Sequence, residues 1–174
     1  MSRAAGDGRA MDHEHYPDSL LRGILRRCKT IAMVGASANW VRPSYFAMKY
    51  LQAKGYRVIP VNPGEAGGEI LGATVYASIA EIPGRIDMVD VLRNSEAAGP
   101  ITDEAVAVAT EKGIEVVWMQ LGVRNDAAAA RAEAAGLTVI MNRCAKIEYG
   151  RLSGELSWSG INSRIISSKR QKAI

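Results

Sequence analysis

Five short apolar runs recur along the chain, each followed by a polar or glycine-containing stretch. They span residues 30–34, 56–61, 86–92, 114–120 and 137–141. Runs of this length are typical of strands that are buried on both faces of a sheet. The second run contains Pro60, which lacks the N–H that a central strand needs. We therefore expect this strand to end there or to lie at a sheet edge.

Stretches with helical spacing of apolar residues alternate with these runs. They cover residues 19–28, 43–54, 103–112 and 126–135. Pro43 suits the first turn of the second helix and Gly55 its end. Thr102 and Asn125 are predicted to cap the third and fourth helices, because their side-chain oxygens can accept from free N–H groups there.

The alternation of strands and helices predicts an α/β fold. Repeated βαβ units give a parallel sheet with right-handed crossovers, so we expect a doubly wound, five-stranded parallel sheet with helices on both faces. Between the second and third strands, residues 62–72 are predicted to form a glycine-rich loop and residues 78–82 a single helical turn. The length suits one domain at residues 19–150, between a flexible arm at 1–18 and a basic tail at 151–174.

The net charge of the chain is concentrated near its C-terminus. The formal net charge is +4, yet residues 1–150 contain equal numbers of acidic and basic side chains. The tail carries Arg151, Arg164, Lys169, Arg170 and Lys172. A basic tail beside a balanced body argues only weakly for nucleic acid, because no aromatic-studded basic stripe accompanies it.

The sequence predicts neither a membrane partner nor a metal. No apolar run approaches the roughly 20 residues that cross a bilayer, and residues 1–19 lack the apolar core of a secretory signal. Cys28 and Cys144 lie far apart, without a CxxC spacing or a disulfide framework. We therefore expect reduced thiols and a cytoplasmic protein.

The carboxyl ends of the predicted strands are the expected binding site, because ligands of open α/β sheets bind where the strand order reverses. The first strand is followed by Gly35, Ala36 and Ser37, and glycine lets a backbone approach a phosphate beside the free N–H groups of a helix start. Arg42 and Ser44 flank that helix start and would add a cation and a hydroxyl. The next strand ends contribute Asn62, Pro63, Leu92 and Arg93.

Catalytic groups are scarce around this predicted crevice. Residues 120–122 and 142–144 also follow strands and would face it, but Cys144 has no histidine of the body to activate it. The only histidines, His13 and His15, fall in the predicted arm. We therefore predict no catalytic residue.

Two aspartates of the third predicted strand are better explained as structural groups. Asp87 and Asp90 are separated by an odd number of positions, so their side chains point to opposite faces of the sheet. This separation favours edge or capping carboxylates over an acid/base pair.

A dinucleotide site is an open alternative. The loop Gly35-Ala36-Ser37-Ala38-Asn39-Trp40 lacks two of the glycines of the GxGxxG fingerprint, and the second strand ends in Val61-Asn62-Pro63 without an acidic residue. Glu65 is near enough to hold a ribose. An NAD(P)-dependent oxidoreductase and a nucleotide-binding regulatory protein that acts through the tail both stay open.

The motifs VGAS, RPSY, VIPVNP, WMQLGV and NRC together resemble the small single-domain CoA-binding proteins, over about residues 16–150. These are similar to the CoA-binding domain of the succinyl-CoA synthetase alpha subunit. The resemblance implies a Rossmann-like fold that binds coenzyme A or an acyl-CoA. It also implies that the pyrophosphate lies at Gly35, Ala36 and Ser37, the adenosine near Asn62 and Pro63, and further contacts at Leu92 and Arg93.

One position departs from the synthetase-type pattern. Where those domains place a lysine toward a CoA phosphate, this chain has Glu65, and a carboxylate would repel a 3′-phosphate. The chain also lacks the second domain and the phosphorylated histidine of the synthetase. The resemblance therefore implies a binding module, with a homodimer or a partner enzyme subunit both open.

Overall fold

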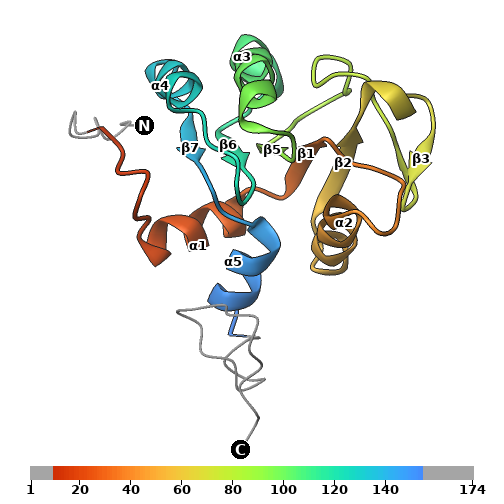
Figure 1. Ribbon diagram of the computed structural model, residues 1–174, viewed down its shortest axis with the longest axis horizontal. Helices are drawn as coiled ribbons and strands as arrows, with labels where there is room; N and C mark the ends of the chain where they lie inside the picture. The colour runs from red at the N-terminus through yellow and green to blue at the C-terminus, as the bar shows by residue number, and fades with distance from the viewer. Residues whose placement is uncertain (1–9, 155–174) are drawn as a thin grey trace, which may run out of the picture.

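The computed structural model describes residues 10–154, which form a parallel sheet with helices on both faces (Figure 1). The five strands lie in the order β2-β1-β5-β6-β7 and all pair in parallel. They are β1 Thr30–Val34, β2 Arg57–Val61, β5 Met88–Val91, β6 Val116–Met119 and β7 Thr138–Ile140. The predicted fold class is confirmed, and each predicted strand contains one of these five.

The two faces of the sheet are covered by different helices (Figure 1). One face packs against α3 Ser95–Lys112 and α4 Asp126–Ala134, and the other against α1 Asp18–Arg27, α2 Pro43–Ala53 and α5 Ala145–Leu152. Because side chains alternate along a strand, Val89 and Val117 enter the first core while Met88 and Trp118 enter the second. The two cores together hold the strand ends at fixed positions.

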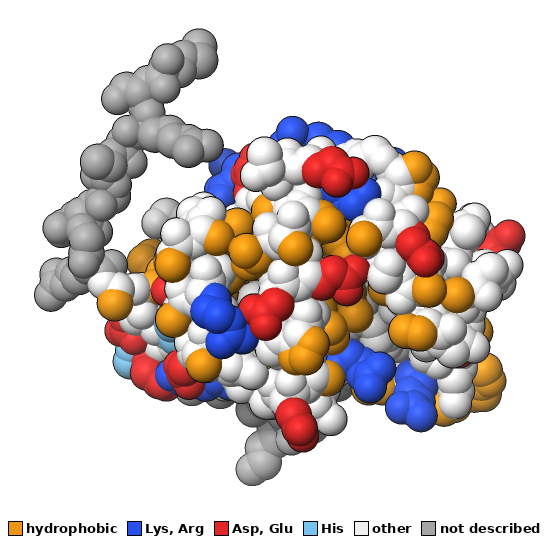
Figure 2. Space-filling model, turned by 90° about the horizontal axis from the view of Figure 1, so that it is seen from above, with side chains coloured by type: hydrophobic (Ala, Val, Ile, Leu, Met, Phe, Trp, Pro, Cys, Tyr) orange, Lys and Arg blue, Asp and Glu red, His pale blue; other side chains and the backbone are white. Residues whose placement is uncertain are grey.

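The face covered by α3 and α4 carries acidic and basic side chains beside one another (Figure 2). On α4, for example, Arg131 pairs with Asp103 of α3 at 2.8 Å. Such a mixed surface balances its own charges, so this face offers no basic stripe to a polyanion.

Strand β2 lies at the sheet edge, as Pro60 predicts. The Pro60 carbonyl accepts from the N–H of Tyr76 at 3.0 Å, and the Tyr76 carbonyl accepts from the N–H of Asn62 at 2.9 Å. The predicted loop after β2 contains a 3-10 turn at Pro63–Glu65 and a small hairpin of β3 Glu69–Ile70 and β4 Ala73–Thr74.

Two predictions about helices are wrong. Helix α3 begins at Ser95, because the side chain of Asn94 accepts from the N–H of Ala97 at 2.8 Å and caps the helix there. Thr102, the predicted cap, is fully buried inside the helix. Residues 78–82 form bends and turns instead of a helical turn, and this segment is held by the buried Lys112 ammonium, which donates to the Ile82 carbonyl at 2.5 Å.

The ends of the described chain lie against the folded body. In the predicted arm, the Tyr16 hydroxyl accepts from the N–H of Met141 at 2.9 Å, and His13 lies 2.8 Å from Glu133. Arg151, the first residue assigned to the tail, belongs to α5 and pairs with Asp18 at 2.8 Å. Residues 1–9 of the arm and the tail cations Arg164, Lys169, Arg170 and Lys172 lie outside the described residues.

Residues 10–154 contain neither a membrane-spanning helix nor a cluster of metal ligands. No helix in this range is long and apolar enough to cross a bilayer. Nor does this range bring together three or more His, Cys, Asp or Glu side chains that could hold a metal ion.

The two aspartates near β5 have structural surroundings. Asp87 accepts from the N–H groups of Lys29 and Thr30 at 2.9 and 3.0 Å. Burial raises the pKa of Asp87, but these bonds and Arg85 outweigh it and leave the pKa lowered. Asp90 is 1% exposed, its Oδ1 has no partner within the described residues, and burial raises its pKa to about 7.

The raised pKa of Asp90 predicts how stability varies with pH. The folded state holds this proton more tightly than the unfolded state, so the free energy of unfolding falls as pH rises from about 4 to about 7. Asp90→Asn cannot ionise and escapes this loss. We expect denaturant titrations to show the variant gaining more than about 1 kcal/mol relative to wild type between pH 5 and pH 8. Asp103→Asn, at an exposed site, is the control, and a pH-independent difference for Asp90→Asn would contradict the prediction.

Candidate functional site

The strand order reverses between β1 and β5, and a pocket opens there at the carboxyl ends of the strands. From β1 the chain crosses to β2 on one side, and β5 then pairs with β1 on the other side. The pocket has a volume of about 510 Å³. We call it the β1–β5 pocket, and it is lined by Gly35, Ser37, Arg42, Asn62, Glu65, Leu92, Arg93 and Asn94.

Gly35 allows the loops after β1 and β5 to approach each other closely. Its N–H donates to the Val61 carbonyl at 2.9 Å, and the Leu92 N–H donates to the Val34 carbonyl at 2.8 Å. Its φ is +94°, and a Cβ at this position would lie 2.5 Å from the Leu92 carbonyl oxygen. Glycine is therefore required here both by the backbone conformation and by the space.

The loop after β1 is held by side chains that bond to its backbone. The Asn62 amide donates to the Ala36 carbonyl at 2.8 Å, and its Oδ1 accepts from the N–H of Gly64 at 2.9 Å. Within the loop, Ser37 Oγ accepts from the N–H of Asn39 at 3.1 Å. These bonds fix the loop before a ligand arrives, which lowers the ordering cost of binding.

Glu65 reaches into this loop from the 3-10 turn after β2. Its Oε2 accepts from the N–H of Ala38 at 3.0 Å. A carboxylate of the chain thus occupies one of the backbone donors that an incoming anion would use. It also lines the pocket, where it offsets part of the positive charge.

Two arginines bring positive charge to the β1–β5 pocket. Arg42 directly precedes α2, whose N-terminal end adds the positive end of the helix dipole, and Arg93 follows β5. Both arginines are exposed, and within residues 10–154 neither forms an ion pair. Their guanidinium groups are therefore available to an anion.

The structure brings six of the nine predicted binding residues together. They are Gly35, Ser37, Arg42, Asn62, Leu92 and Arg93. Ala36 and Ser44 are buried at 1% and 7% exposure, because Ala36 packs into the core and Ser44 lies in the first turn of α2. Pro63 begins the 3-10 turn and lies outside the lining.

The two other predicted segments contact each other instead of the β1–β5 pocket. Asn142 Oδ1 accepts from the N–H of Gly122 at 2.8 Å, and the Gln120 amide lies 3.5 Å from Cys144 Sγ. His13 is bound to Glu133 and to Tyr16 and is absent from the pocket lining, as is His15. Burial raises the pKa of the other thiol, Cys28, to about 11, which makes it a poor nucleophile.

Exposed apolar side chains cluster in sequence around the loop after β1, a feature that the hydrophobic pattern alone does not predict. Trp40 is 68% exposed, Val41 58% and Phe46 48%; Trp40 and Val41 precede α2, and Phe46 lies in its first turn. Large apolar side chains exposed in one short segment are typical of a surface that binds a ligand or a partner. The sequence does contain a signal for this surface, since large apolar residues interrupt the polar pattern expected of a loop.

Comparisons with known proteins agree with this architecture. The model of one family, described as a CoA binding domain, matches residues 29–150. The protein YneT of Bacillus subtilis (strain 168) is 38% identical over 129 residues, which are 74% of this chain and 91% of YneT.

Two solved structures are similar in both sequence and fold. One is Prb, a PH1109 protein redesigned for binding, with 39% identity and a TM-score of 0.74 over 80% of this chain and 94% of its own. The other is a hypothetical protein from Pyrococcus horikoshii OT3, with 36% identity and a TM-score of 0.74 over 85% of this chain and 100% of its own.

The crowding at Gly35 makes a testable prediction. Gly35→Ala should cost about 3 kcal/mol of stability or more, because overpacking adds to the cost of a left-handed residue. Gly122→Ala is the matched control: its φ is +84° but nothing lies within 4 Å of the new Cβ, so only about 1–2 kcal/mol is expected. Denaturant unfolding of both variants measures the difference, and equal losses would show that the Leu92 contact is unimportant.

Proposed function

The chain belongs to the family of CoA binding domains, whose model matches residues 29–150, and from this membership we propose that the β1–β5 pocket binds coenzyme A or an acyl-CoA. The observation that carries the proposal is the meeting of the Gly35 loop, the α2 start and two arginines, which have no ion pair within residues 10–154, at the reversal of strand order. That combination suits a pyrophosphate.

The pyrophosphate is proposed to lie at Gly35, Ala36 and Ser37. Gly35 supplies a backbone without a Cβ, so that a phosphate can approach closely, and α2 contributes its positive end. Arg42 and Arg93 are proposed to bind the phosphate oxygens from either side. Arginine suits this role because its planar fork can donate two bonds to one phosphate.

The adenosine is proposed to lie near Asn62 and Pro63, with Leu92 as an apolar wall. Leu92 is half-buried and Pro63 is exposed beside the pocket. Asn62 is already fixed by two bonds, so its part is to hold the loop that supports the ligand. Flat apolar surfaces beside fixed polar groups are typical of nucleotide sites.

An acyl-CoA would find an apolar surface close to this site. Trp40, Val41 and Phe46 are exposed next to the loop that is proposed to bind the pyrophosphate. Covering them with an acyl chain would remove apolar area from water, at roughly 25 cal/mol per Å². This favours an acyl-CoA as the natural ligand.

We propose a binding role without catalysis by this chain alone. The β1–β5 pocket is lined by glycine, amides, hydroxyl, two arginines and one carboxylate, and neither histidine lines it. A nucleophile paired with a base, which acyl transfer would need, is not assembled in the described lining. A reaction would then depend on a partner chain.

A second candidate function rests on Glu65. Its carboxylate lines the pocket close to the end of β2, where dinucleotide-binding enzymes hold a ribose with an acidic residue. An oxidoreductase that uses NAD(P) would place the ribose there and the pyrophosphate at the Gly35 loop.

Parallel calorimetric titrations with CoA, dephospho-CoA and NAD test the proposal. We expect CoA to bind and Arg93→Gln to weaken it about tenfold, because a charge-assisted bond to phosphate is lost. Arg131→Gln is the matched control, since Arg131 lies on α4 outside the pocket lining, where it pairs with Asp103 of α3. Binding of NAD without CoA would favour the oxidoreductase, and no binding of either would overturn both.

Glu65 makes a separate prediction about affinity. Glu65→Gln should bind CoA about fivefold more tightly than wild type at low salt, because a negative charge beside the incoming phosphate is removed. The gain should shrink as salt is added. Glu69→Gln, an exposed carboxylate on β3 outside the pocket lining, is the control. Unchanged binding by Glu65→Gln would mean that the carboxylate does not oppose the ligand, and weaker binding would mean that it supports the ligand.

A further inference from the structure

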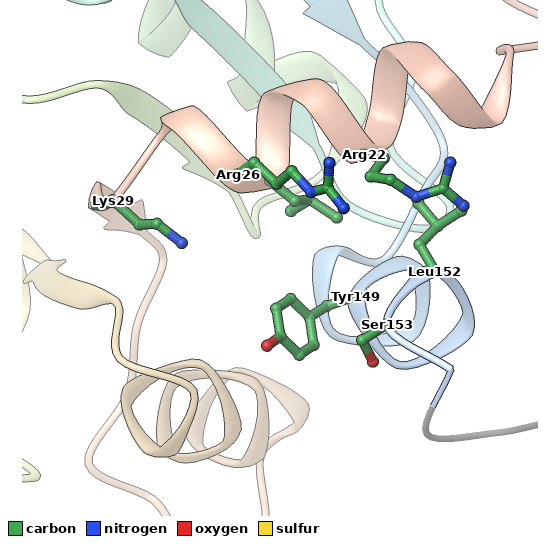
Figure 3. Close-up of a pocket in the computed structure, with 7 residues that line it drawn as sticks. Arg22, Arg26, Lys29, Tyr149, Leu152 and Ser153 are labelled. Atoms are coloured by element: carbon green, nitrogen blue, oxygen red, sulfur yellow. The ribbon is translucent and has the colours of Figure 1, made fainter. Parts of the chain in front are cut away.

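A second pocket, of about 230 Å³, lies between α1 and α5. Lys29 lines it just before β1 begins, whereas the β1–β5 pocket lies beyond the other end of that strand, about 17 Å of extended chain away. We call it the α1–α5 pocket. Its lining is Arg22, Leu25, Arg26, Lys29, Tyr149, Leu152 and Ser153 (Figure 3).

The charges of the α1–α5 pocket are unbalanced. Three of its seven lining residues are cations, and none is acidic. The acids nearby are used by other arginines: Glu115 pairs with Arg27 at 3.0 Å, and Glu148 pairs with Arg151 at 2.7 Å. Within residues 10–154, Arg22 and Arg26 have no ion-pair partner. Positive groups held together without a counter-charge repel one another.

The wall of the pocket around Lys29 and Tyr149 is held by several contacts. The backbone N–H of Lys29 donates to Asp87, and its ammonium lies 4.7 Å from the centre of the Tyr56 ring. Tyr149 packs edge-on against Tyr56 and Tyr50, with ring centres 5.8 and 6.0 Å away. The Tyr56 hydroxyl donates to the Leu25 carbonyl. A fixed wall of this kind gives a site whose shape exists before binding.

Favourable interaction with the dipole of α1 does not explain why Arg22, Arg26 and Lys29 lie together. Cations in the last turn of a helix stabilise it, which suits Arg26 and Arg27. Arg22, however, lies a turn earlier, and Lys29 lies beyond the helix end. Figure 3 shows Arg22, Arg26 and Lys29 on the α1 side of the same space, with Tyr149, Leu152 and Ser153 across from them. The shared direction points to a common anionic partner.

We propose that the α1–α5 pocket is a second anion site that binds a phosphate-bearing ligand with two or more negative charges. A phosphomonoester carries about −1.5 to −2 at neutral pH and a carboxylate only −1, so a phosphate group balances three cations better. The two arginines can each donate two bonds to phosphate oxygens. Such a ligand is an inorganic polyphosphate or the phosphate chain of a nucleotide.

The proposal is tested with pyrophosphate, titrated calorimetrically at constant ionic strength into the full-length chain. Because pyrophosphate also suits the Gly35 loop, the titrations use wild type, Arg93→Gln, Arg22→Gln and Arg26→Gln. We expect Arg93→Gln to retain a pyrophosphate site. Two double variants, which add Arg22→Gln or Arg26→Gln to Arg93→Gln, should bind pyrophosphate there at least tenfold more weakly. Acetate, with one charge, should bind none of them measurably. ADP in place of pyrophosphate distinguishes a nucleotide from an inorganic ligand.

Controls separate this proposal from the function of the first pocket. Arg22→Gln and Arg26→Gln should keep the CoA site that Arg93→Gln weakens, although the phosphates of CoA can also occupy the α1–α5 pocket. Arg131→Gln should leave pyrophosphate binding unchanged. The melting temperatures of the variants without ligand check that they fold. No pyrophosphate binding by Arg93→Gln, or equal binding by Arg93→Gln and its double variants, would each overturn the second site, whatever the CoA titrations of wild type show.

Discussion

The approach of Gly35 to the carbonyl of Leu92 joins the two loops on which the β1–β5 pocket depends. The parallel pairing of β1 with β5 brings these loops together, and only a residue without a side chain lets the pairing continue to their ends. The positions of Ser37 and Arg93 follow from that contact, because each lies within two residues of it. Asn62, which follows β2, then connects the end of that strand to the same loop. The shape of the pocket is thus set by the close approach of two backbones and by side chains that bond to the loop.

The two pockets differ in how their charge is balanced. The β1–β5 pocket contains its own carboxylate, Glu65, bound to a backbone donor of the loop, so a ligand anion there competes with a group of the chain. The α1–α5 pocket has no acid in its lining. Strong binding at the first pocket therefore requires contacts beyond charge, such as apolar ones, whereas charge alone favours occupation of the second. The β1–β5 pocket would therefore select among anionic ligands by their apolar groups, whereas the α1–α5 pocket would select mainly by their charge.

Local pattern predicts the strands well, and it predicts which loops follow them, because both depend on short-range rules. Buried parallel strands are continuous apolar runs, their carboxyl ends lie at one edge of the sheet, and a reversal of strand order opens a crevice at that edge. The start of α3 was missed because Gly99 and Pro100 resemble a break, while the cap at Asn94 depends on where β5 ends. The bond from Glu65 to Ala38 joins two loops and has no local signal. The α1–α5 pocket was missed because α5 was not predicted.

The edge of the sheet at β2 has a consequence for contacts between copies of the chain. The outward-facing N–H that another strand would need is absent at Pro60, and the carbonyl there is already taken by Tyr76. An approaching strand would find neither a donor nor a free acceptor at Pro60, near the carboxyl end of this border. Strand addition is therefore blocked at Pro60, and at the opposite border the three-residue strand β7 presents only a short edge to another copy of the chain.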